Sequence, residues 1–150
     1  MATHLPTKTR SSRIDGENTR AHIIEVAGQL FAEAVTSKMI CTEANVNMAA
    51  VNYHFGSRDG LYRSVLLDVH QRLANLQALN LLADAPIEPK QKLELIIRAI
   101  LSQMNSTDWY IRFYIREAVA ANDIFIEILR QQAVPKSQAL FRIFSQITGL

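Results

Sequence analysis

The residues with the clearest chemical potential lie in one segment, which reads NMAAVNYHFGSR from Asn47 to Arg58. An asparagine amide can pair with adenine, and an alanine methyl can contact a thymine methyl in the major groove of DNA. Tyr53 and His54 can donate hydrogen bonds to phosphates. Ser57 and Arg58 stand where a helix begins, and the free N–H groups there favour an anion such as phosphate. This is the chemistry of DNA recognition.

These side chains need a short helix with a tight turn on each side, and the sequence predicts both. Asn47 is a natural N-cap for a helix from Met48 to His54. Asn45 tolerates the positive φ that a turn before this helix demands. The pair Gly56-Ser57 then breaks the chain, and Ser57 caps a longer helix from Arg58 to about Leu82.

Two further helices must precede the short one if it is to be held against DNA. The first is expected to begin at Asn18 or Thr19, and its apolar stripe consists of Ile23, Ile24, Ala27, Leu30 and Phe31. The second begins after the N-cap residue Thr36 and turns Ile40 and Ala44 inward. A helix-turn-helix places its second helix in the major groove while the helix before it braces the backbone.

The rest of the chain is also predicted to be helical. A proline-marked link over residues 84–89 precedes an amphipathic helix that carries Leu93 to Met104. Another helix runs from Trp109 to about Ala121, and a short one from Ile124 to Gln132. Pro135 suits the first turn of a last helix. Because no strand alternation occurs, the fold class is all-α.

The string VNYHFGSRDGLY and the stripe IIEVAGQLF closely resemble the TetR family of transcriptional regulators, over about residues 19–66. This resemblance implies an N-terminal three-helix helix-turn-helix domain, joined by a long helix to a helical ligand-binding and dimerisation domain. It implies a homodimer that binds a pseudo-palindromic operator as a repressor and is released by a small-molecule effector. Residues 67–150 resemble the C-terminal domain of a subgroup only weakly.

By family position, Thr36 and Tyr53 would contact phosphates, and Arg58 stands where relatives usually carry lysine. Lys38, Ala49, Ala50 and Asn52 would face bases or nearby phosphates. The full set of expected DNA contacts is Thr36, Ser37, Lys38, Asn47, Met48, Ala49, Ala50, Asn52, Tyr53, His54, Ser57 and Arg58. The corresponding domains are a flexible basic arm over 1–18, a helix-turn-helix domain over 19–63, and an effector-binding and dimerisation domain over 64–150.

The sequence departs from the family pattern in several places. Relatives usually carry about four more residues between the first two helices. Here only Ala34 and Val35 separate them, and two residues span roughly 7 Å at full extension. Either a loop is missing from the chain or the domain is disrupted, and the first is favoured. Met39 weakens the capping box of Thr36, and Asn45 replaces a turn glycine. The resemblance also predicts dimer-forming helices beyond Leu150.

Candidates for the ligand site are a cluster rich in aromatic residues, since such side chains line pockets in helical bundles. The candidates are Met104, Trp109, Tyr110, Phe113, Tyr114 and Arg116. Aromatic residues at helical spacing are more often core, so both interpretations stay open, and Arg116 could instead form an interhelical ion pair with Glu117. Cys41 is expected to be a small buried hydrophobic residue. His70 is expected to be partly exposed.

Composition sets the wider limits. The chain has 150 residues, 49% of them hydrophobic, and a net charge of +2, values compatible with a globular nucleic-acid-binding protein. No segment is long and apolar enough for a membrane span, and the N-terminus lacks the apolar region of a signal peptide, so the expected compartment is the cytoplasm. No catalytic, metal-binding or cofactor-binding motif occurs, so an enzyme is not expected. The alternative function is a helical protein-interaction module without DNA binding.

Overall fold

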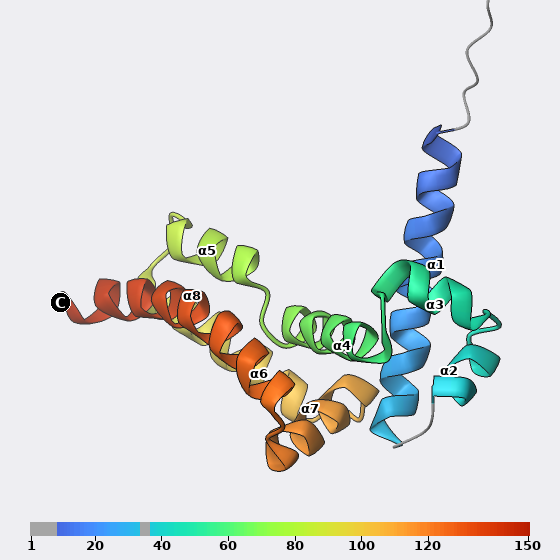
Figure 1. Cartoon of the computed structure of the whole chain (residues 1–150). Coiled ribbons are helices and arrows are strands. Elements are labelled where there is room, and N and C mark those ends of the chain that lie inside the picture. Colours follow the sequence, from blue (N-terminus) through green and yellow to red (C-terminus); the bar gives the residue numbers. More distant parts are fainter. Residues whose placement is uncertain (1–8, 34–36) are drawn as a thin grey trace, which may run out of the picture.

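The computed structural model describes residues 9–33 and 37–150 of the chain. In this described part the structure is entirely helical and contains no strand, which confirms the expected fold class (Figure 1). The helices are α1 (Thr9–Ala32), α2 (Ser37–Glu43), α3 (Met48–Phe55), α4 (Arg58–Leu73), α5 (Leu76–Asp84), α6 (Pro89–Met104), α7 (Trp109–Ala120) and α8 (Asp123–Thr148). No helix of the described residues is long and apolar enough to cross a membrane.

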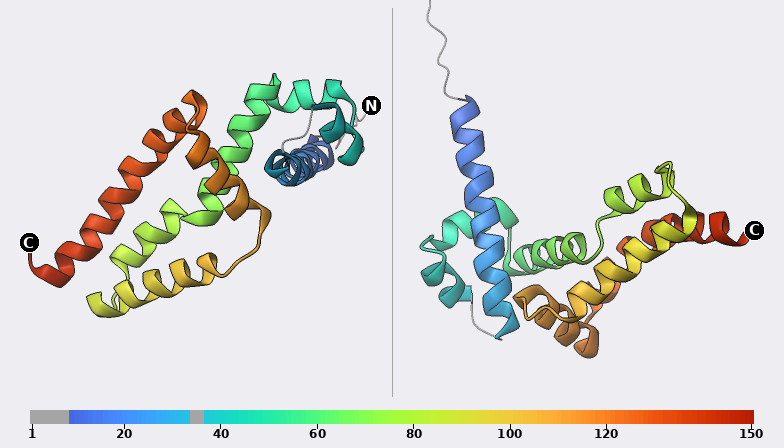
Figure 2. Two further views of the ribbon diagram at one scale, coloured as in Figure 1. Left: turned by 90° about the horizontal axis from the view of Figure 1, so that it is seen from below. Right: turned by 180° about the vertical axis from the view of Figure 1, so that it is seen from behind.

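One apolar core joins the N-terminal helices to α4 and α7. Helix α1 contributes its expected stripe, and Ile23 and Ala27 are fully buried. Ile40 and Ala44 of α2 also point inward, as predicted. Helix α1 packs against α2, α4 and α7, so the DNA-binding unit and the C-terminal helices share a core (Figure 2). Packing of the buried apolar side chains of these helices therefore fixes the position of the N-terminal helices relative to the C-terminal helices.

Helix α1 begins earlier than the sequence pattern suggests. It starts at Thr9 rather than at Asn18 or Thr19, and the hydroxyl of Thr19 donates to the carbonyl of Asp15 one turn earlier, at 2.8 Å. No proline interrupts residues 9–32, and threonine is compatible with a helix interior when its hydroxyl bonds in this way. The expectation of a mobile arm is therefore wrong for residues 9–18. Residues 1–8 lie outside the described part.

The predicted long helix from Arg58 to Leu82 is wrong, because the chain breaks between α4 and α5. Ala74 adopts an extended conformation, and Asn75 caps α5 by accepting a hydrogen bond from the Ala78 N–H at 3.0 Å. Side chains from other helices bind the carbonyls at the break. The Gln103 amide donates to Leu73 O at 2.7 Å, and Lys136 Nζ donates to His70 O at 2.9 Å. Tertiary contacts thus stabilise a break that apolar periodicity does not reveal.

The short helix predicted from Ile124 to Gln132 and the last helix predicted to begin near Pro135 form a single helix, α8. Helix α8 runs through Pro135, although a proline in a helix interior removes a hydrogen bond and costs about 3 kcal/mol. Both halves of α8 are held by buried side chains, with Phe125 and Ile128 before the proline and Ala139 and Ile143 after it. Burial of a large apolar side chain contributes about 1.5–3 kcal/mol. Packing therefore outweighs the local cost, and the proline does not start a new helix.

His70 is buried, at 5% exposure, and not partly exposed as predicted. Its ring lies edge-on to Tyr114 at 5.4 Å, and its Nε2 has no hydrogen-bond partner among the residues that the structure describes. Burial, with a smaller contribution from the charge of Lys136, lowers the pKa of His70 to about 4. The histidine is therefore neutral at physiological pH.

This pKa makes a prediction for stability. The unfolded chain takes up a proton on His70 near pH 6.5, whereas the folded chain does so only near pH 4. The stabilisation is therefore present above pH 6.5 and is lost as the pH falls through this window, by about 2 kcal/mol between pH 7 and 4.5. Urea unfolding at both pH values measures this loss. His70→Phe keeps an aromatic ring beside Tyr114 and should remove that part of the pH dependence, whereas an unchanged dependence would contradict the assignment.

Candidate nucleic-acid interface

Helix α3 has the geometry that the sequence predicts for a recognition helix. The Asn47 side chain caps it by accepting from the Ala50 N–H at 2.8 Å, and Asn45 in the preceding turn has φ 53°. Gly56 ends the helix with φ 75°, a conformation that glycine adopts without steric cost. Val51 is 3% exposed and anchors the inner face of α3 in the core. The short helix is therefore fixed by capping interactions at both ends and by the burial of Val51 in the core.

The outer face of α3 carries most of the expected base-reading side chains. Met48 is 45% exposed and Tyr53 85% exposed, and Ala49 and Asn52 are also exposed. Ala50 and His54 are half-buried, and the His54 ring packs edge-on against Tyr53 at 5.0 Å. The exposed side chains thus share one face that can approach the floor of a major groove.

The turn after α3 brings a second helix N-terminus beside this face. Ser57 caps α4 by accepting from the Gly60 N–H at 3.0 Å, as the sequence predicts. A role for Gly60 escaped the sequence analysis. A Cβ at this position would lie 1.9 Å from the carbonyl oxygen of Phe55, so only glycine lets α4 pass this close to the end of α3. Close approach, and not backbone torsion, requires this residue.

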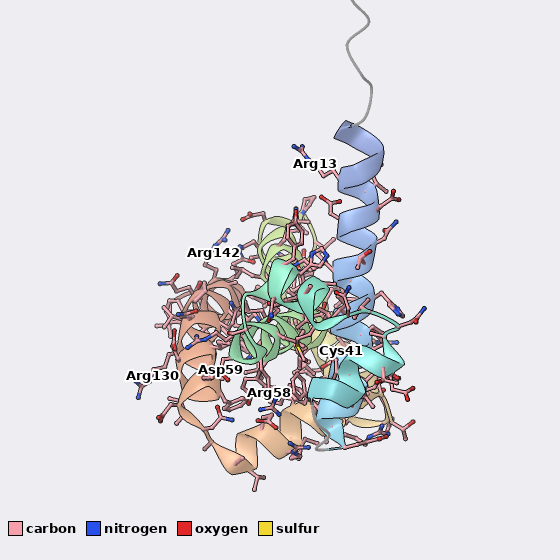
Figure 3. The ribbon with its side chains drawn as sticks, turned by 45° about the vertical axis from the view of Figure 1, so that its right-hand side comes forward. Arg13, Cys41, Arg58, Asp59, Arg130 and Arg142 are labelled. Atoms are coloured by element: carbon pink, nitrogen blue, oxygen red, sulfur yellow. The ribbon has the colours of Figure 1, made fainter. Side chains whose placement is uncertain are left out.

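Arg58 is the first residue of α4, directly after the turn that ends α3. Its guanidinium lies over the Phe31 ring at 5.6 Å, and its side chain lines a cavity of about 310 Å³ together with Arg116 and Glu117. Figure 3 shows Arg58 between the start of α4 and the ribbon of α7 and α8. Arg58 is exposed, so its charge still adds to the positive field near the α4 N-terminus.

Several predicted contacts lie where the structure gives no side-chain position. Thr36 lies outside the described residues, and Ser37 and Lys38 are described only as part of the α2 backbone. Arg20, which the sequence analysis did not select, lies over the Phe55 ring at 5.2 Å and donates to Ser64 Oγ at 3.4 Å. Arg13 projects from the upper end of α1 (Figure 3). Both arginines are exposed, and Arg20 lies beside the end of α3.

A buried polar cluster joins α4 to the C-terminal helices. Glu117, which is 4% exposed, accepts hydrogen bonds from the Tyr62 hydroxyl and from the Asn122 amide, the latter at 3.0 Å. The Asn122 amide also donates to the Tyr62 oxygen at 2.7 Å. Burial and the nearby Glu117 carboxylate raise the pKa of Tyr62 above its usual range, so Tyr62 stays a protonated donor. These contacts fix α7 and α8 against α4.

A second cluster ties α1 to both α4 and α7. Glu25 accepts from the Trp109 indole N–H at 2.7 Å and from Arg72 Nη2 at 2.7 Å. The Arg72 guanidinium also lies over the Trp109 ring at 5.1 Å. Gly28 allows this arrangement, because a Cβ there would lie 2.2 Å from the Trp109 ring. The DNA-binding helices are thereby connected directly to helices that carry the candidate ligand site.

The six candidate ligand residues occupy three different environments. Trp109 and Phe113 are buried in the shared core, and Tyr110 and Tyr114 pack against it. Met104 is 74% exposed. Arg116 donates to the Phe31 carbonyl of α1 and lies 3.4 Å from Glu117 on its own helix, so the ion pair is not interhelical. Cys41 is half-buried against the core.

A different set of residues lines an apolar cavity of about 380 Å³ between α4, α5, α6 and α8. Leu79, Leu82, Ile96 and Leu140 form its walls, and none of the six candidates lines it. Its size lies in the range of small-molecule pockets. Within the described residues, no cluster of three or more His, Cys, Asp or Glu could hold a metal ion. This cavity escaped the sequence analysis because the α4–α5 break that helps to form it was not predicted.

The comparisons with known proteins agree with this geometry. Residues 23–65 match the family model of the bacterial regulatory proteins of the tetR family, a range that holds α2, α3 and the start of α4. Residues 89–150 match the model of the C-terminal domain of the HTH-type transcriptional dual regulator CecR, a range that holds α6 to α8. No curated protein matches the chain. The resemblance noted in the sequence is thus confirmed by two models on separate parts of one helical fold, and the chain belongs to the TetR family of DNA-binding transcriptional regulators.

Proposed function

We propose that this regulator is a homodimeric repressor that a small molecule releases from a pseudo-palindromic operator. The observation that carries the proposal is the exposed outer face of α3, which presents Ala49, Asn52 and Tyr53 on a helix anchored by Val51. Side chains of this kind read base edges in the major groove when a helix enters it. The two α3 helices of a dimer would occupy successive major grooves, roughly 34–36 Å apart.

The DNA contacts divide by chemistry. Asn52 would read an adenine, and Ala49 and Ala50 would face bases through their methyl groups. The helix would be positioned on the DNA sugar-phosphate backbone by the polar side chains of Asn47, Tyr53, His54 and Ser57, together with Thr36, Ser37 and Lys38. Met48 has no donor for a phosphate and would contribute an apolar contact. The stacking of Arg58 on Phe31 favours a role for Arg58 in the local field over a direct base contact.

The effector would bind in the cavity between α4, α5, α6 and α8. Arg72 lines this cavity and also pairs with Glu25 of α1, so a ligand that moves the end of α4 acts directly on the DNA-binding helices. The ligand can release DNA only to the extent that it prefers a conformation with a different spacing of the two α3 helices. Trp109 and Phe113 of the aromatic cluster then act as the packed connection between the parts, and Trp109 is the residue that bonds to Glu25.

The dimer would form through apolar side chains that α8 leaves exposed. Phe141 is 67% exposed and Phe144 44% exposed, and Val134 lies on the same helix. Exposed aromatic side chains of this kind are enriched at the centres of protein interfaces. A second copy of the chain is the occupant that a two-fold operator requires.

Fluorescence anisotropy of the chain with DNA from beside its own coding region tests the proposal. We expect tight binding that excess random DNA does not displace, with an affinity that falls steeply as salt rises, because cationic side chains release condensed counterions from phosphates. A folded chain that binds neither the DNA from beside its coding region nor the random DNA would contradict the proposal and would favour the helical protein-interaction module.

Asn52→Ala sharpens this test, because it removes the one exposed amide in the middle of α3. We expect specific affinity to fall roughly 10-fold and the preference at one base pair to be lost, since a bidentate base contact is worth about 1–3 kcal/mol. Asn80→Ala, an asparagine change on α5 far from α3, serves as the matched control. Unchanged base preference in Asn52→Ala would show that Asn52 does not read a base.

A further inference from the structure

The cavity between α4, α5, α6 and α8 has an unusual distribution of charge. Apolar side chains supply most of its wall, and only two of its described lining residues, Arg72 and Lys136, are charged. Both are cations, and no carboxylate is among the described residues that line the cavity. An apolar cavity with a few polar groups at one end is the usual form of a small-molecule site, and the polar groups select the ligand.

The charge of Arg72 is already neutralised. Its Nε donates to Asp68 at 2.7 Å, and its Nη2 donates to Glu25 at 2.7 Å. The guanidinium also lies over the rings of Trp109 and Tyr110. The Arg72 guanidinium thus already contacts two carboxylates and two aromatic rings. An incoming ligand would have to displace one of these partners to bind the guanidinium.

Lys136 is different, since no carboxylate of the described residues lies within ion-pair distance of its Nζ. Its single hydrogen bond goes to the His70 carbonyl at 2.9 Å, at the end of α4. An ammonium has three N–H donors, so two remain for another acceptor. The side chain is half-buried, and burial lowers the pKa of Lys136, which is the effect of a cation without a counter-charge in a poorly solvated place.

The adjacent histidine does not compete for an anion or supply one. His70 is neutral at physiological pH, and its Nε2 has no hydrogen-bond partner within the described part of the chain. Among the described residues, Lys136 is therefore the one uncompensated charge on the wall of this apolar cavity. An anion bound there would supply the missing counter-charge and would be held strongly.

We propose that this cavity binds an apolar molecule carrying one acid group, of the class of medium-chain carboxylates, whose oxygen atoms accept hydrogen bonds from Lys136 Nζ. The hydrocarbon part lies among Leu79, Leu82, Ile96 and Leu140. The inference rests on the proposed function, because it names the chemical class of the effector. A Lys136 that only caps the end of α4 is the competing interpretation, and it predicts no preference for an acid.

Isothermal titration calorimetry of the chain with decanoate, 1-decanol and decylamine separates the two interpretations. We expect decanoate to bind at least 10-fold more tightly than 1-decanol, and decylamine not to bind. Lys136→Met should lower decanoate affinity at least 10-fold while 1-decanol affinity is kept, which also shows that the cavity stays intact. Lys90→Met, on the exposed side of α6, is the matched control and should bind decanoate as the natural chain does.

A second variant tests the location without touching Lys136. Ala99 lines the cavity, so Ala99→Phe should fill it and abolish binding of both decanoate and 1-decanol. The inference is overturned if 1-decanol or decylamine binds the natural chain as tightly as decanoate, or if Lys136→Met keeps full decanoate affinity. Operator binding is measured on the same samples. Acid binding without DNA binding would contradict the proposed function but not this inference. DNA binding without a preference for the acid would contradict this inference but not the proposed function.

Discussion

Gly60→Ala is expected to destabilise the fold by about 3 kcal/mol and to abolish specific DNA binding. The new Cβ would lie 1.9 Å from the carbonyl oxygen and 3.0 Å from the carbonyl carbon of Phe55. Both atoms belong to the backbone, so either the end of α3 or the start of α4 must move. Overpacking of this kind typically costs 1–3 kcal/mol, and more when no flexible side chain can yield. The displaced α3 would also lose its orientation toward DNA.

Urea unfolding and operator anisotropy measure the two effects, and the chain provides a matched control. A Cβ added at Gly16, in the exposed part of α1, meets nothing within 4 Å. Gly16→Ala should leave DNA binding unchanged and raise stability by up to about 1 kcal/mol, because alanine is the better helix former. Equal unfolding midpoints for Gly60→Ala and Gly16→Ala would show that the turn between α3 and α4 tolerates a side chain.

Glu117→Ala is expected to cost about 3 kcal/mol and to loosen α7 and α8 from α4. The carboxylate of Glu117 is 4% exposed and accepts from both Tyr62 and Asn122. Its removal leaves two half-buried donors with fewer acceptors, and an unsatisfied group that is fully buried costs about 1–3 kcal/mol. Because this cluster lies between the DNA-binding helices and the effector helices, operator affinity should fall as well.

Glu127→Ala is the matched control for this change. Glu127 also joins α8 to α4, through an ion pair with Arg63 at 2.8 Å, but its side chain is 49% exposed. Exposed ion pairs contribute only about 0–1 kcal/mol, so this variant should unfold close to the natural midpoint. Urea unfolding of the two variants side by side decides the matter. The cluster would have no special role if Glu117→Ala were no less stable than Glu127→Ala.

The helix-turn-helix was predictable from the sequence because its signals are local. Asn47 and Ser57 cap the helices that follow them, and Asn45 and Gly56 adopt the positive φ that their types favour. Each of these signals acts over three or four residues, so no distant contact can change it. The exposed face of α3 followed from the same pattern, since Val51 alone of its central residues is apolar enough to be buried.

The C-terminal part was predicted less well, because contacts between distant residues decide it. The α4–α5 break depends on Gln103 and Lys136 reaching carbonyls at the end of α4, and the continuity of α8 through Pro135 depends on packing of both its halves. Aromatic residues on α7 were open to two interpretations, and burial of Trp109 and Phe113 against α1 places them in the core.

The sequence by itself therefore determined the helical class, the family and the recognition helix, since periodicity, caps and turn residues are encoded within a few residues of each element. Only the tertiary structure decided where helices end or continue against their local preference, and which side chains meet across the chain. It placed Arg58 on Phe31, left Lys136 without a counter-charge from the described residues, and brought Gly60 against the Phe55 carbonyl. These features arise from the packing of elements far apart in sequence, whose energies no local pattern contains.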